Sequence, residues 1–313
     1  MFRGIIPPLV TPLLGSDELD EAAFCRLIDH VIAGGVHGIF VLGTTGEGPS
    51  LSTALQRRVI QVATRQAANR VPVLVGITHP AYAESMKLAD YAAQCSASAL
   101  VLAAPYYFPA AQNELCDYLA EIVPALPLPV MLYNMPSMTK LVLEPDTIRT
   151  SLTWPNCVGV KDSSGDIQYF GQVVTIAKAR KDFSVLMGPE HLLRQSMAIG
   201  GHGGVHGGAN VYPRLFVSLY DAALTGAPTS KLEDQVRRLG AMYRIGGNPA
   251  SSVIRSIKCA LSLIGLGDAR MAPPFTAFAE HERKQVQQVL ADAVEDTSDH
   301  PIASHVSHAK GTR

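Results

Sequence analysis

The chain has 313 residues, of which 47% are hydrophobic and 17% are charged, and its formal net charge is −1. This composition supplies a sizeable core, argues against intrinsic disorder and lacks the basic excess of a nucleic-acid binder. No run approaches the roughly 18 apolar residues that a membrane helix needs. The first residues lack a signal-peptide pattern, because Pro7, Pro8 and Pro12 interrupt the apolar stretch. Neither nucleic acid nor a membrane is an expected partner.

Short β-rich runs alternate with longer amphipathic stretches along the first two thirds of the chain. Several runs are near-continuously aliphatic, as expected of strands that helices cover on one face. The predicted helices include 21–33, 53–68, 81–94, 114–123 and 167–179. The predicted strands are 5–9, 38–42, 72–77, 99–104, 129–133, 158–161, 184–187 and 204–207. Eight strand–helix units predict an α/β fold, a (β/α)8 TIM barrel over residues 1–225; an open doubly wound sheet, the alternative, usually has fewer strands.

After residue 230 the strand pattern stops and three helical stretches follow, at about 231–244, 250–263 and 274–294. They predict a C-terminal helical region, 226–295, packed on the barrel. Residues 296–313 mix Ser, His, Asp, Lys and Gly without periodicity, which predicts a mobile tail. The cysteines are odd in number and scattered, with no Cys-x-x-Cys spacing, which favours reduced thiols and a cytoplasmic location.

Lys161 follows the apolar run Val158-Gly159-Val160 at the end of a predicted buried strand. Removing an ammonium group from water is costly unless something compensates for it. The usual resolution is a neutral amine, which is a nucleophile toward carbonyl carbon. The position therefore indicates Schiff-base chemistry, although a lysine that extends from a strand end into solvent is the simpler structural alternative.

Active sites of such barrels lie at the carboxyl ends of the strands, so these ends were compared in chain order. They carry Gly43-Thr44-Thr45-Gly46-Glu47-Gly48, Pro105-Tyr106-Tyr107, Tyr133-Asn134-Met135-Pro136, Lys161, Gly188-Pro189-Glu190 and Gly207-Gly208-Ala209-Asn210. Together they resemble the dihydrodipicolinate synthase / N-acetylneuraminate lyase family of class I pyruvate-dependent lyases and aldolases. The likeness covers about residues 4 to 295, and its motifs as a set are specific for the family but not for one substrate.

The resemblance implies roles for four catalytic residues. Lys161 would form the Schiff base with a 2-keto acid, and the resulting iminium would stabilise a neighbouring carbanion as an enamine. Tyr133 would be the acid/base group, because a phenol can both donate and accept a proton. Thr44 would relay its proton, and Tyr107 from a neighbouring subunit would complete the relay. The adjacent Tyr106 points the other way, so it could be the residue that packs against the protein while Tyr107 points outward.

A tight loop of small residues favours binding of the keto acid's carboxylate. Gly43, Thr44, Thr45 and Gly46 offer hydroxyls and exposed backbone N–H groups, and no Gly-Lys-Ser/Thr follows that would make the loop a P-loop. Taken alone, the segment is an ordinary glycine turn. Further substrate-contact candidates at the strand ends are Gly188, Glu190, Gly207 and Met138.

A metal site is not expected. His202 and His206, if extended, would be separated by roughly 13 Å, whereas zinc–nitrogen bonds are about 2 Å long. The glycine-rich run 200–204 around them favours close backbone packing, with phosphate binding as the alternative. The resemblance implies chemistry that needs neither a metal nor an organic cofactor.

The motifs depart from two known branches of the family. Synthase members place an arginine two residues after the proline of Tyr-Asn-x-Pro to bind the aldehyde's carboxylate, and here that residue is Met138. Lys140 is a poor substitute. Members that act on sugar acids use acids and hydroxyls after strands seven and eight; Glu190 fits, whereas His191 and Gly207 replace a common acid and a common serine.

The leading hypothesis is a Schiff-base lyase that makes or breaks a C–C bond between pyruvate and an unidentified aldehyde. The product would be a 2-keto-3-deoxy sugar acid or a related hydroxylated 2-oxo acid. The alternatives are the dihydrodipicolinate-forming synthase despite Met138, and a non-catalytic barrel with a binding role. By resemblance, the enzyme is expected to be a homo-oligomer, either a dimer or a tetramer.

Overall fold

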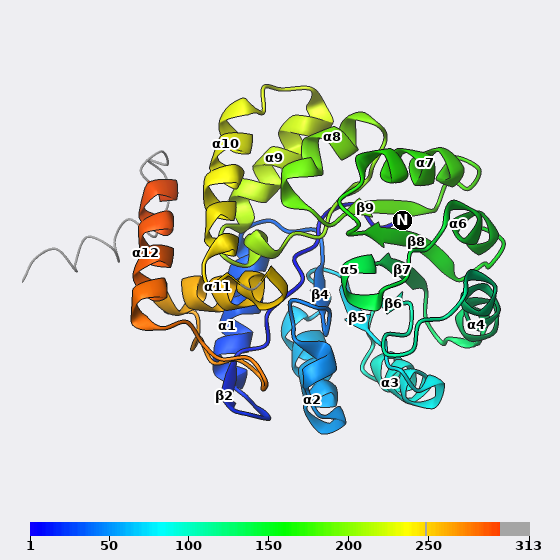
Figure 1. Ribbon diagram of the computed structural model, residues 1–313, viewed down its shortest axis with the longest axis horizontal. Helices are drawn as coiled ribbons and strands as arrows, with labels where there is room; N and C mark the ends of the chain where they lie inside the picture. Colours follow the sequence, from blue (N-terminus) through cyan, green and yellow to red (C-terminus); the bar gives the residue numbers. More distant parts are fainter. Residues whose placement is uncertain (248, 295–313) are drawn as a thin grey trace, which may run out of the picture.

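The computed structural model describes residues 1–247 and 249–294 and contains eight parallel strands surrounded by helices (Figure 1). Adjacent strands follow the order β1-β10-β9-β8-β7-β6-β5-β4. A small antiparallel pair, β2 (Leu13–Gly15) and β3 (Glu18–Leu19), stands apart from this sheet. The eight strands are β1 (Gly4–Ile5), β4 (Ile39–Val41), β5 (Val73–Gly76), β6 (Ala99–Ala103), β7 (Val130–Asn134), β8 (Cys157–Asp162), β9 (Ser184–Met187) and β10 (Gly203–Gly204).

The sheet closes into a barrel between the segment that follows β1 and β4. Phe40 donates its N–H to the Pro7 carbonyl at 3.0 Å, and Leu9 donates to the Phe40 carbonyl at 2.8 Å. Pro8 and Phe40 also form a parallel bridge. The predicted (β/α)8 barrel is therefore confirmed, and each of the eight predicted strands overlaps an observed one.

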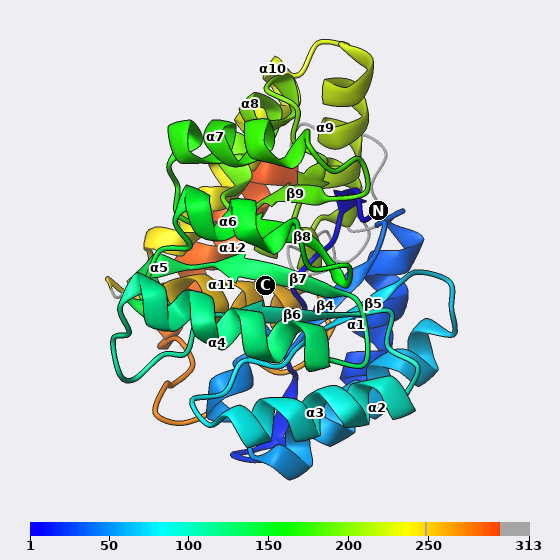
Figure 2. The same cartoon turned by 90° about the vertical axis from the view of Figure 1, so that its right-hand side faces the viewer.

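Helices cover the outside of the barrel (Figure 2). Polar side chains cap the beginnings of several of them. Asp20, Ser52 and Asp166 accept backbone N–H groups of the first turns of α1, α2 and α7, which satisfies donors that otherwise lack partners. The helices of the barrel are α1 (Glu21–Ala33), α2 (Thr53–Ala67), α3 (Tyr82–Gln94), α4 (Gln112–Ala125), α5 (Pro136–Thr139), α6 (Pro145–Ser151), α7 (Ile167–Ala177), α8 (Leu193–Ala198) and α9 (Pro213–Thr225).

The C-terminal helices pack beside the barrel, as predicted. They are α10 (Ser230–Leu239), the 3-10 turn η4 (Gly240–Arg244), α11 (Pro249–Leu263) and α12 (Glu280–Val294). Helix α10 packs on α9, and α11 packs on the 3-10 turn η3 (Gly207–Asn210) at the end of the barrel. The predicted division at residue 225 stays a prediction, and the predicted tail 296–313 lies outside the described residues.

The period-two alternation of the strands separates two apolar clusters. Residues that point into the barrel form the smaller one, which includes Phe40, Val101, Met131, Tyr133 and Leu186. The intervening residues, such as Val130 and Leu132, join the larger cluster between the sheet and the helices. An inward-pointing position near the carboxyl end of a strand is therefore where a polar side chain can reach the mouth of the barrel.

Some predicted boundaries were wrong. The last strand ends at Gly204 rather than Gly207, because the chain turns into η3. The helix predicted at 274–294 begins only at Glu280, where Glu282 Oε2 accepts from Ala279 N at 2.8 Å and so caps the first turn. Helices α5, α6 and α8 were not predicted. Of the helices described, none is long and apolar enough to span a membrane.

The glycine-rich run before η3 packs closely against the start of the chain. Gly203 has φ +144, and a Cβ there would lie 2.1 Å from the Gly4 carbonyl oxygen. The geometry agrees with the close-packing interpretation of residues 200–204. Only a residue without a side chain fits between the two strands.

Asn210 fastens the end of the barrel to its beginning. Its side chain is fully buried; Nδ2 donates to the carbonyls of Pro8 at 2.9 Å and Gly207 at 2.8 Å, and Oδ1 accepts from Val10 N at 3.2 Å. The bonds to Val10 and Pro8 connect residues 200 and 202 positions apart in sequence, beside the paired strands β1 and β10.

We expect Asn210→Ala to lower the free energy of unfolding by about 2–4 kcal/mol, because it leaves several buried polar groups without partners. Urea denaturation followed by circular dichroism measures the change. Asn113→Ala, at an exposed position of α4, is the control and should change stability by no more than about 0.5 kcal/mol. Equal stability of the two variants would contradict the role given to Asn210.

Candidate active site

Lys161 lies on β8 with its side chain inside the mouth of the barrel. The residue is 5% exposed, and Nζ lies 3.9 Å from the ring centroid of Tyr133 and 5.3 Å from that of Phe40. Tyr133 on β7 is the register partner of Lys161, so both side chains point inward at the same level. Two aromatic rings therefore lie beside the amine, and Lys161 also lines the cavity in which a reaction partner would lie.

The hydroxyl of Tyr133 connects Lys161 to the loop after β4. Tyr133 Oη lies 3.5 Å from Thr44 Oγ1, at the limit of a hydrogen bond. Burial raises the pKa of Tyr133, but the nearby Lys161 charge and hydrogen bonds with Thr44, Lys161 and Ser163 outweigh it, and the pKa lies below its ordinary value. A phenol of lowered pKa is better suited to give up and regain a proton near neutral pH.

The next residues on the same two strands fix this arrangement. Asn134 and Asp162 are register partners, and Asn134 Nδ2 donates to Asp162 Oδ1 at 2.8 Å. Asp162 also accepts from Ser164 N at 3.1 Å and from Ser164 Oγ at 3.0 Å. The Asn134 carbonyl accepts from Ser163 N at 2.8 Å. This buried network holds the ends of β7 and β8 together and so fixes the Tyr133–Lys161 spacing.

The loop after β4 turns sharply, and its backbone at Leu42 lies close to the backbone of Gly48 and Gly76. Leu42 has φ 61 and Glu47 has φ 57, left-handed values that are uncommon for residues with a side chain. The space beneath Leu42 is tight: a Cβ on Gly48 would lie 2.3 Å from the Leu42 carbonyl oxygen, and one on Gly76 of β5 would lie 2.5 Å from it. The loop can adopt its shape only because both positions are glycine.

A cavity of about 590 Å³ opens above Lys161. Its wall combines strand ends of the barrel with residues of α10, η4 and α11. Among its lining residues are Thr44, Thr45, Tyr133, Met138, Lys161, Ser163, Gly188, Glu190, Gly207, Arg237, Tyr243 and Arg244.

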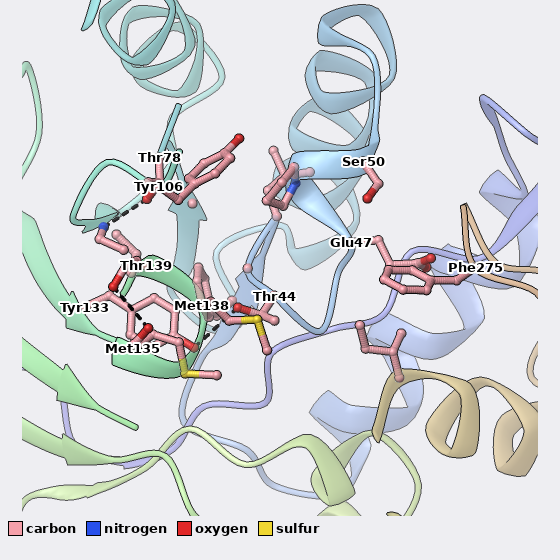
Figure 3. Close-up of a pocket in the computed structure, with 18 residues that line it drawn as sticks. Thr44, Glu47, Ser50, Thr78, Tyr106, Tyr133, Met135, Met138, Thr139 and Phe275 are labelled. Atoms are coloured by element: carbon pink, nitrogen blue, oxygen red, sulfur yellow. Dashed lines mark hydrogen bonds between the residues drawn. The ribbon is translucent and has the colours of Figure 1, made fainter. Parts of the chain in front are cut away.

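A second, mostly apolar cavity of about 260 Å³ lies on the other side of Tyr133 and Thr44. Figure 3 shows Tyr133 and Met135 on one side of it, Glu47 and Phe275 on the other, and Met138 and Thr44 between them. Because Thr44, Tyr133 and Met138 line both cavities, the hydroxyl pair stands at the boundary between the two spaces.

The structure places most predicted site residues around these cavities. Gly43 lines the smaller cavity. Gly46 lies behind the loop, where a Cβ would be 2.9 Å from the Leu9 carbonyl oxygen, and it lines neither cavity. Tyr107 is 83% exposed and points away from the site of its own chain, whereas Tyr106 lines the smaller cavity. Lys140 is exposed, and its Nζ donates to the Ser137 carbonyl at 2.9 Å.

The sequence model of the dihydrodipicolinate synthetase family matches residues 1–293. The chain belongs to this family. Its members are class I, Schiff-base-forming, pyruvate-dependent lyases and aldolases, so the predicted enzyme class is confirmed.

Two relatives carry the names of enzymes with different substrates. The chain is 34% identical to 4-hydroxy-tetrahydrodipicolinate synthase of Phenylobacterium zucineum, over 94% of this chain and 98% of the relative. It is 33% identical to YjhH of Escherichia coli, a probable 2-dehydro-3-deoxy-D-pentonate aldolase, over 92% and 96% of the two chains. The chain is thus a pyruvate-dependent aldolase of this family whose second substrate these relatives do not decide.

Solved structures of members of the same family superpose closely on this chain. Dihydrodipicolinate synthase of Bacteroides thetaiotaomicron superposes with a TM-score of 0.89 at 45% identity, covering 93% of this chain and 98% of the other. YagE of E. coli, solved in complex with pyruvate, superposes with a TM-score of 0.87 at 28% identity, covering 94% and 99%.

Glu190 is the acidic group of the larger cavity. Its Oε1 accepts from Gly208 N at 2.5 Å and from the Tyr243 hydroxyl at 2.9 Å. Its Oε2 is buried and has no hydrogen-bond partner among the described residues. Burial raises the pKa of Glu190 to about 7, although both hydrogen bonds act in the opposite direction. Near neutral pH the carboxyl group can therefore both accept and donate a hydrogen bond.

Several residues of the cavity wall were not predicted from the sequence. Ser163 follows the lysine by two positions, so its place after β8 could have suggested it. Arg237, Tyr243 and Arg244 come from the C-terminal helical region, and no motif marks them. The C-terminal helical region therefore forms part of the wall of the larger cavity.

Each of the two histidines considered as ligands uses its Nδ1 atom in a hydrogen bond with the backbone, whereas the buried Nε2 atom of His206 has no hydrogen-bond partner among the described residues. His202 Nδ1 accepts from Val185 N at 3.0 Å, and His206 Nδ1 donates to the Gly188 carbonyl at 2.9 Å. Burial lowers the pKa of His206 to about 4. Within residues 1–247 and 249–294, no three His, Cys, Asp or Glu side chains are grouped so that they could hold a metal ion.

The raised pKa of Glu190 predicts a pH effect on stability. The folded state holds this proton up to about pH 7, whereas an unfolded glutamate loses it near pH 4.3. Between these values the folded state binds more protons, so this group lowers the free energy of unfolding as the pH rises. Relative to Glu190→Gln, the wild type should lose stability from about pH 5 to about pH 7 and then level off.

Urea denaturation of both proteins across this pH range measures the difference. Glu121→Gln, at an exposed position of α4, is the control and should differ from the wild type by a constant amount. A constant difference for Glu190→Gln as well would show that Glu190 is ionised in the folded state throughout this range.

Proposed function

We propose that this enzyme makes or breaks the C3–C4 bond between pyruvate and a neutral, polyhydroxylated aldehyde, so that its substrate or product is a 2-keto-3-deoxy sugar acid. The observation that supports this most is the composition of one cavity. Lys161 and Tyr133 lie on one part of its wall, the Glu190–Tyr243 pair on another, and Met138 stands where synthase members have arginine. The name of YjhH agrees with this class of substrate, and the YagE complex agrees with pyruvate as the shared substrate.

The chemistry follows from the positions of three side chains. The Lys161 amine attacks the C2 carbonyl. Tyr133 then gives its proton to the hydroxyl of the carbinolamine, so that water leaves and an iminium ion and a Tyr133 phenolate remain. In the cleavage direction the Tyr133 phenolate takes the proton of the C4 hydroxyl, the C3–C4 bond breaks, and its electrons remain on the pyruvate part as an enamine. The aldehyde leaves. Thr44, 3.5 Å from the Tyr133 hydroxyl, passes the proton onward.

The loop after β4 is suited to the carboxylate of pyruvate. Thr44 and Thr45 line the cavity at its mouth, and their hydroxyls and backbone N–H groups are donors of the kind that an anion needs. Anchoring the carboxylate there would bring the C2 carbonyl over Lys161.

Tyr107 would act in a second copy of the chain. It is 83% exposed and stacks edge-on against Phe108, with ring centroids 5.0 Å apart. The apolar cavity of about 260 Å³ that is lined by Thr44 and Tyr133 has room for an aromatic side chain from a neighbour. The oligomeric state and the cytoplasmic location remain predictions.

The aldehyde would meet polar groups that recognise hydroxyls. The free Oε2 of Glu190 can bond a substrate hydroxyl, and Tyr243 holds the carboxyl group in place. Met138 is 38% exposed and lines both cavities; its thioether cannot bind a carboxylate as a guanidinium group does. The second candidate is the synthase, favoured by 45% identity to the Bacteroides structure.

The Schiff base can be trapped directly. We expect borohydride treatment with pyruvate to add one pyruvate-derived mass per chain, on the peptide that contains Lys161, because reduction makes the imine permanent. Intact-mass and peptide mass spectrometry measure the label. Lys161→Met should abolish it, and the control Lys140→Met, at an exposed lysine, should not. An unlabelled wild type, or a label on another residue, would refute the role of Lys161.

Substrate choice can be tested at position 138. We expect Met138→Arg to raise kcat/KM for pyruvate plus aspartate semialdehyde by about 10-fold or more, because a charge-assisted hydrogen bond contributes about 1.5–3 kcal/mol. Cleavage of 2-dehydro-3-deoxy-D-pentonate, measured by pyruvate release, should not increase. Met138→Leu keeps the side chain apolar and is the control. If the wild type already condenses pyruvate with aspartate semialdehyde with a kcat/KM of about 10⁵ M⁻¹ s⁻¹, the enzyme is the synthase.

A further inference from the structure

A buried ion pair joins the loop after β4 to the C-terminal helical region. Glu47 closes the motif Gly43-Thr44-Thr45-Gly46-Glu47, and its carboxylate pairs with Lys258 Nζ of α11. Both side chains are 1% exposed. The same carboxylate accepts from Ala272 N at 2.8 Å, and Lys258 Nζ donates to the Arg270 carbonyl at 2.7 Å. The pair therefore ties the loop to two separate parts of the chain beyond residue 257.

Glu47 also determines the backbone of the loop. Its N–H donates to the Thr44 carbonyl at 3.0 Å, and its carbonyl accepts from Ser50 N at 2.8 Å. Its left-handed φ of 57 costs free energy in a residue with a side chain. The side-chain contacts with Lys258 and Ala272 hold Glu47 in this conformation, and through the Thr44 carbonyl they fix the orientation of the Thr44–Thr45 peptide group.

A buried ion pair is weak evidence for a purely stabilising role. The cost of removing two charges from water often cancels their attraction, and apolar replacements of both partners are frequently neutral for stability. An apolar pair could fill the same volume but could not orient the loop by directed bonds. Stability alone thus does not account for a charged pair at this position.

We propose that Glu47 and Lys258 are positioning residues for binding of the 2-keto acid's carboxylate. They hold the peptide groups of Thr44 and Thr45 in the orientation that receives the anion, so the C-terminal helical region takes part in binding pyruvate as well as the aldehyde. The inference rests on the proposed function, in which the carboxylate lies at this loop and Lys161 forms the Schiff base.

The test compares two double variants. Glu47→Met/Lys258→Met removes both charges of the buried pair. Arg255→Met/Glu282→Met removes another poorly exposed ion pair of the same region, whose side chains are 14% and 13% exposed and which lines neither cavity. Each full-length protein is titrated with pyruvate under borohydride, and labelling of Lys161 is read by mass spectrometry. Acetone, a ketone without a carboxylate, is titrated in parallel.

We expect the pyruvate concentration for half-maximal labelling of the Glu47/Lys258 double variant to be at least about 10-fold higher than that of the wild type, because oriented hydrogen bonds to the carboxylate are lost. Its labelling by acetone should match the wild type, as should both titrations of the Arg255/Glu282 control. An unchanged pyruvate requirement, or an equal loss with pyruvate and acetone, would overturn the inference. An unlabelled wild type would instead refute the proposed function.

If the double variant does not fold, Glu47→Gln decides the question in the same assay. The amide oxygen can still accept from Ala272 N, but the neutral group binds Lys258 less strongly, since hydrogen bonds between ionised partners are roughly twice as strong as neutral ones. A selective increase in the pyruvate requirement, with acetone unaffected, supports the inference. If Glu47→Gln needs the same concentrations of pyruvate and of acetone as the wild type for half-maximal labelling, the inference is overturned.

Discussion

The register between β7 and β8 is the constraint on which the site depends. Tyr133 lies opposite Lys161 and Asn134 lies opposite Asp162, and side chains alternate between the two faces of a strand. A shift by one residue would send the lysine outward among the helices and bring Asp162 into the barrel. The buried Asn134–Asp162 hydrogen bond, at 2.8 Å, favours the observed register because any other would break it and leave the Asn134 Nδ2 donor without this partner. The position of Lys161 is thus determined in part by the residues that follow it and Tyr133 on the two strands.

The residues of the site come from two regions of the chain, the barrel and the C-terminal helical region. Lys161, Tyr133 and Thr44, the proposed nucleophile and proton-transfer groups, come from β8, β7 and the loop after β4. Under the proposed function the groups that face the second substrate include Arg237, Tyr243 and Arg244 of the C-terminal helical region. Members of one family can therefore share the pyruvate chemistry and differ in aldehyde, since the two sets of side chains are carried by different elements.

Much of this arrangement could be predicted from the sequence, because it depends on local patterns. Aliphatic runs located the eight strands, and the carboxyl ends of parallel strands converge, so Lys161, Tyr133 and Thr44 were expected together. Tyr243 and Lys258 could not be found in this way: how α10, η4 and α11 dock on the barrel is decided by tertiary packing, and a lysine in an amphipathic helix resembles any solvent-exposed one. The late start of α12 was missed because the apolar residues within 275–279 continue the pattern of the helix, although the chain is not helical before Glu280.

The glycine at position 76 shows how far the loop after β4 depends on its surroundings. Gly76 belongs to β5, yet a Cβ there would lie 2.5 Å from the Leu42 carbonyl oxygen, so the neighbouring strand leaves room for the turn. The shape of the six residues from Gly43 to Gly48 is consequently not encoded in those residues alone. Grafting this hexapeptide onto another barrel would transfer its hydroxyls but not its curvature, unless the recipient strand also lacked a side chain at the equivalent point.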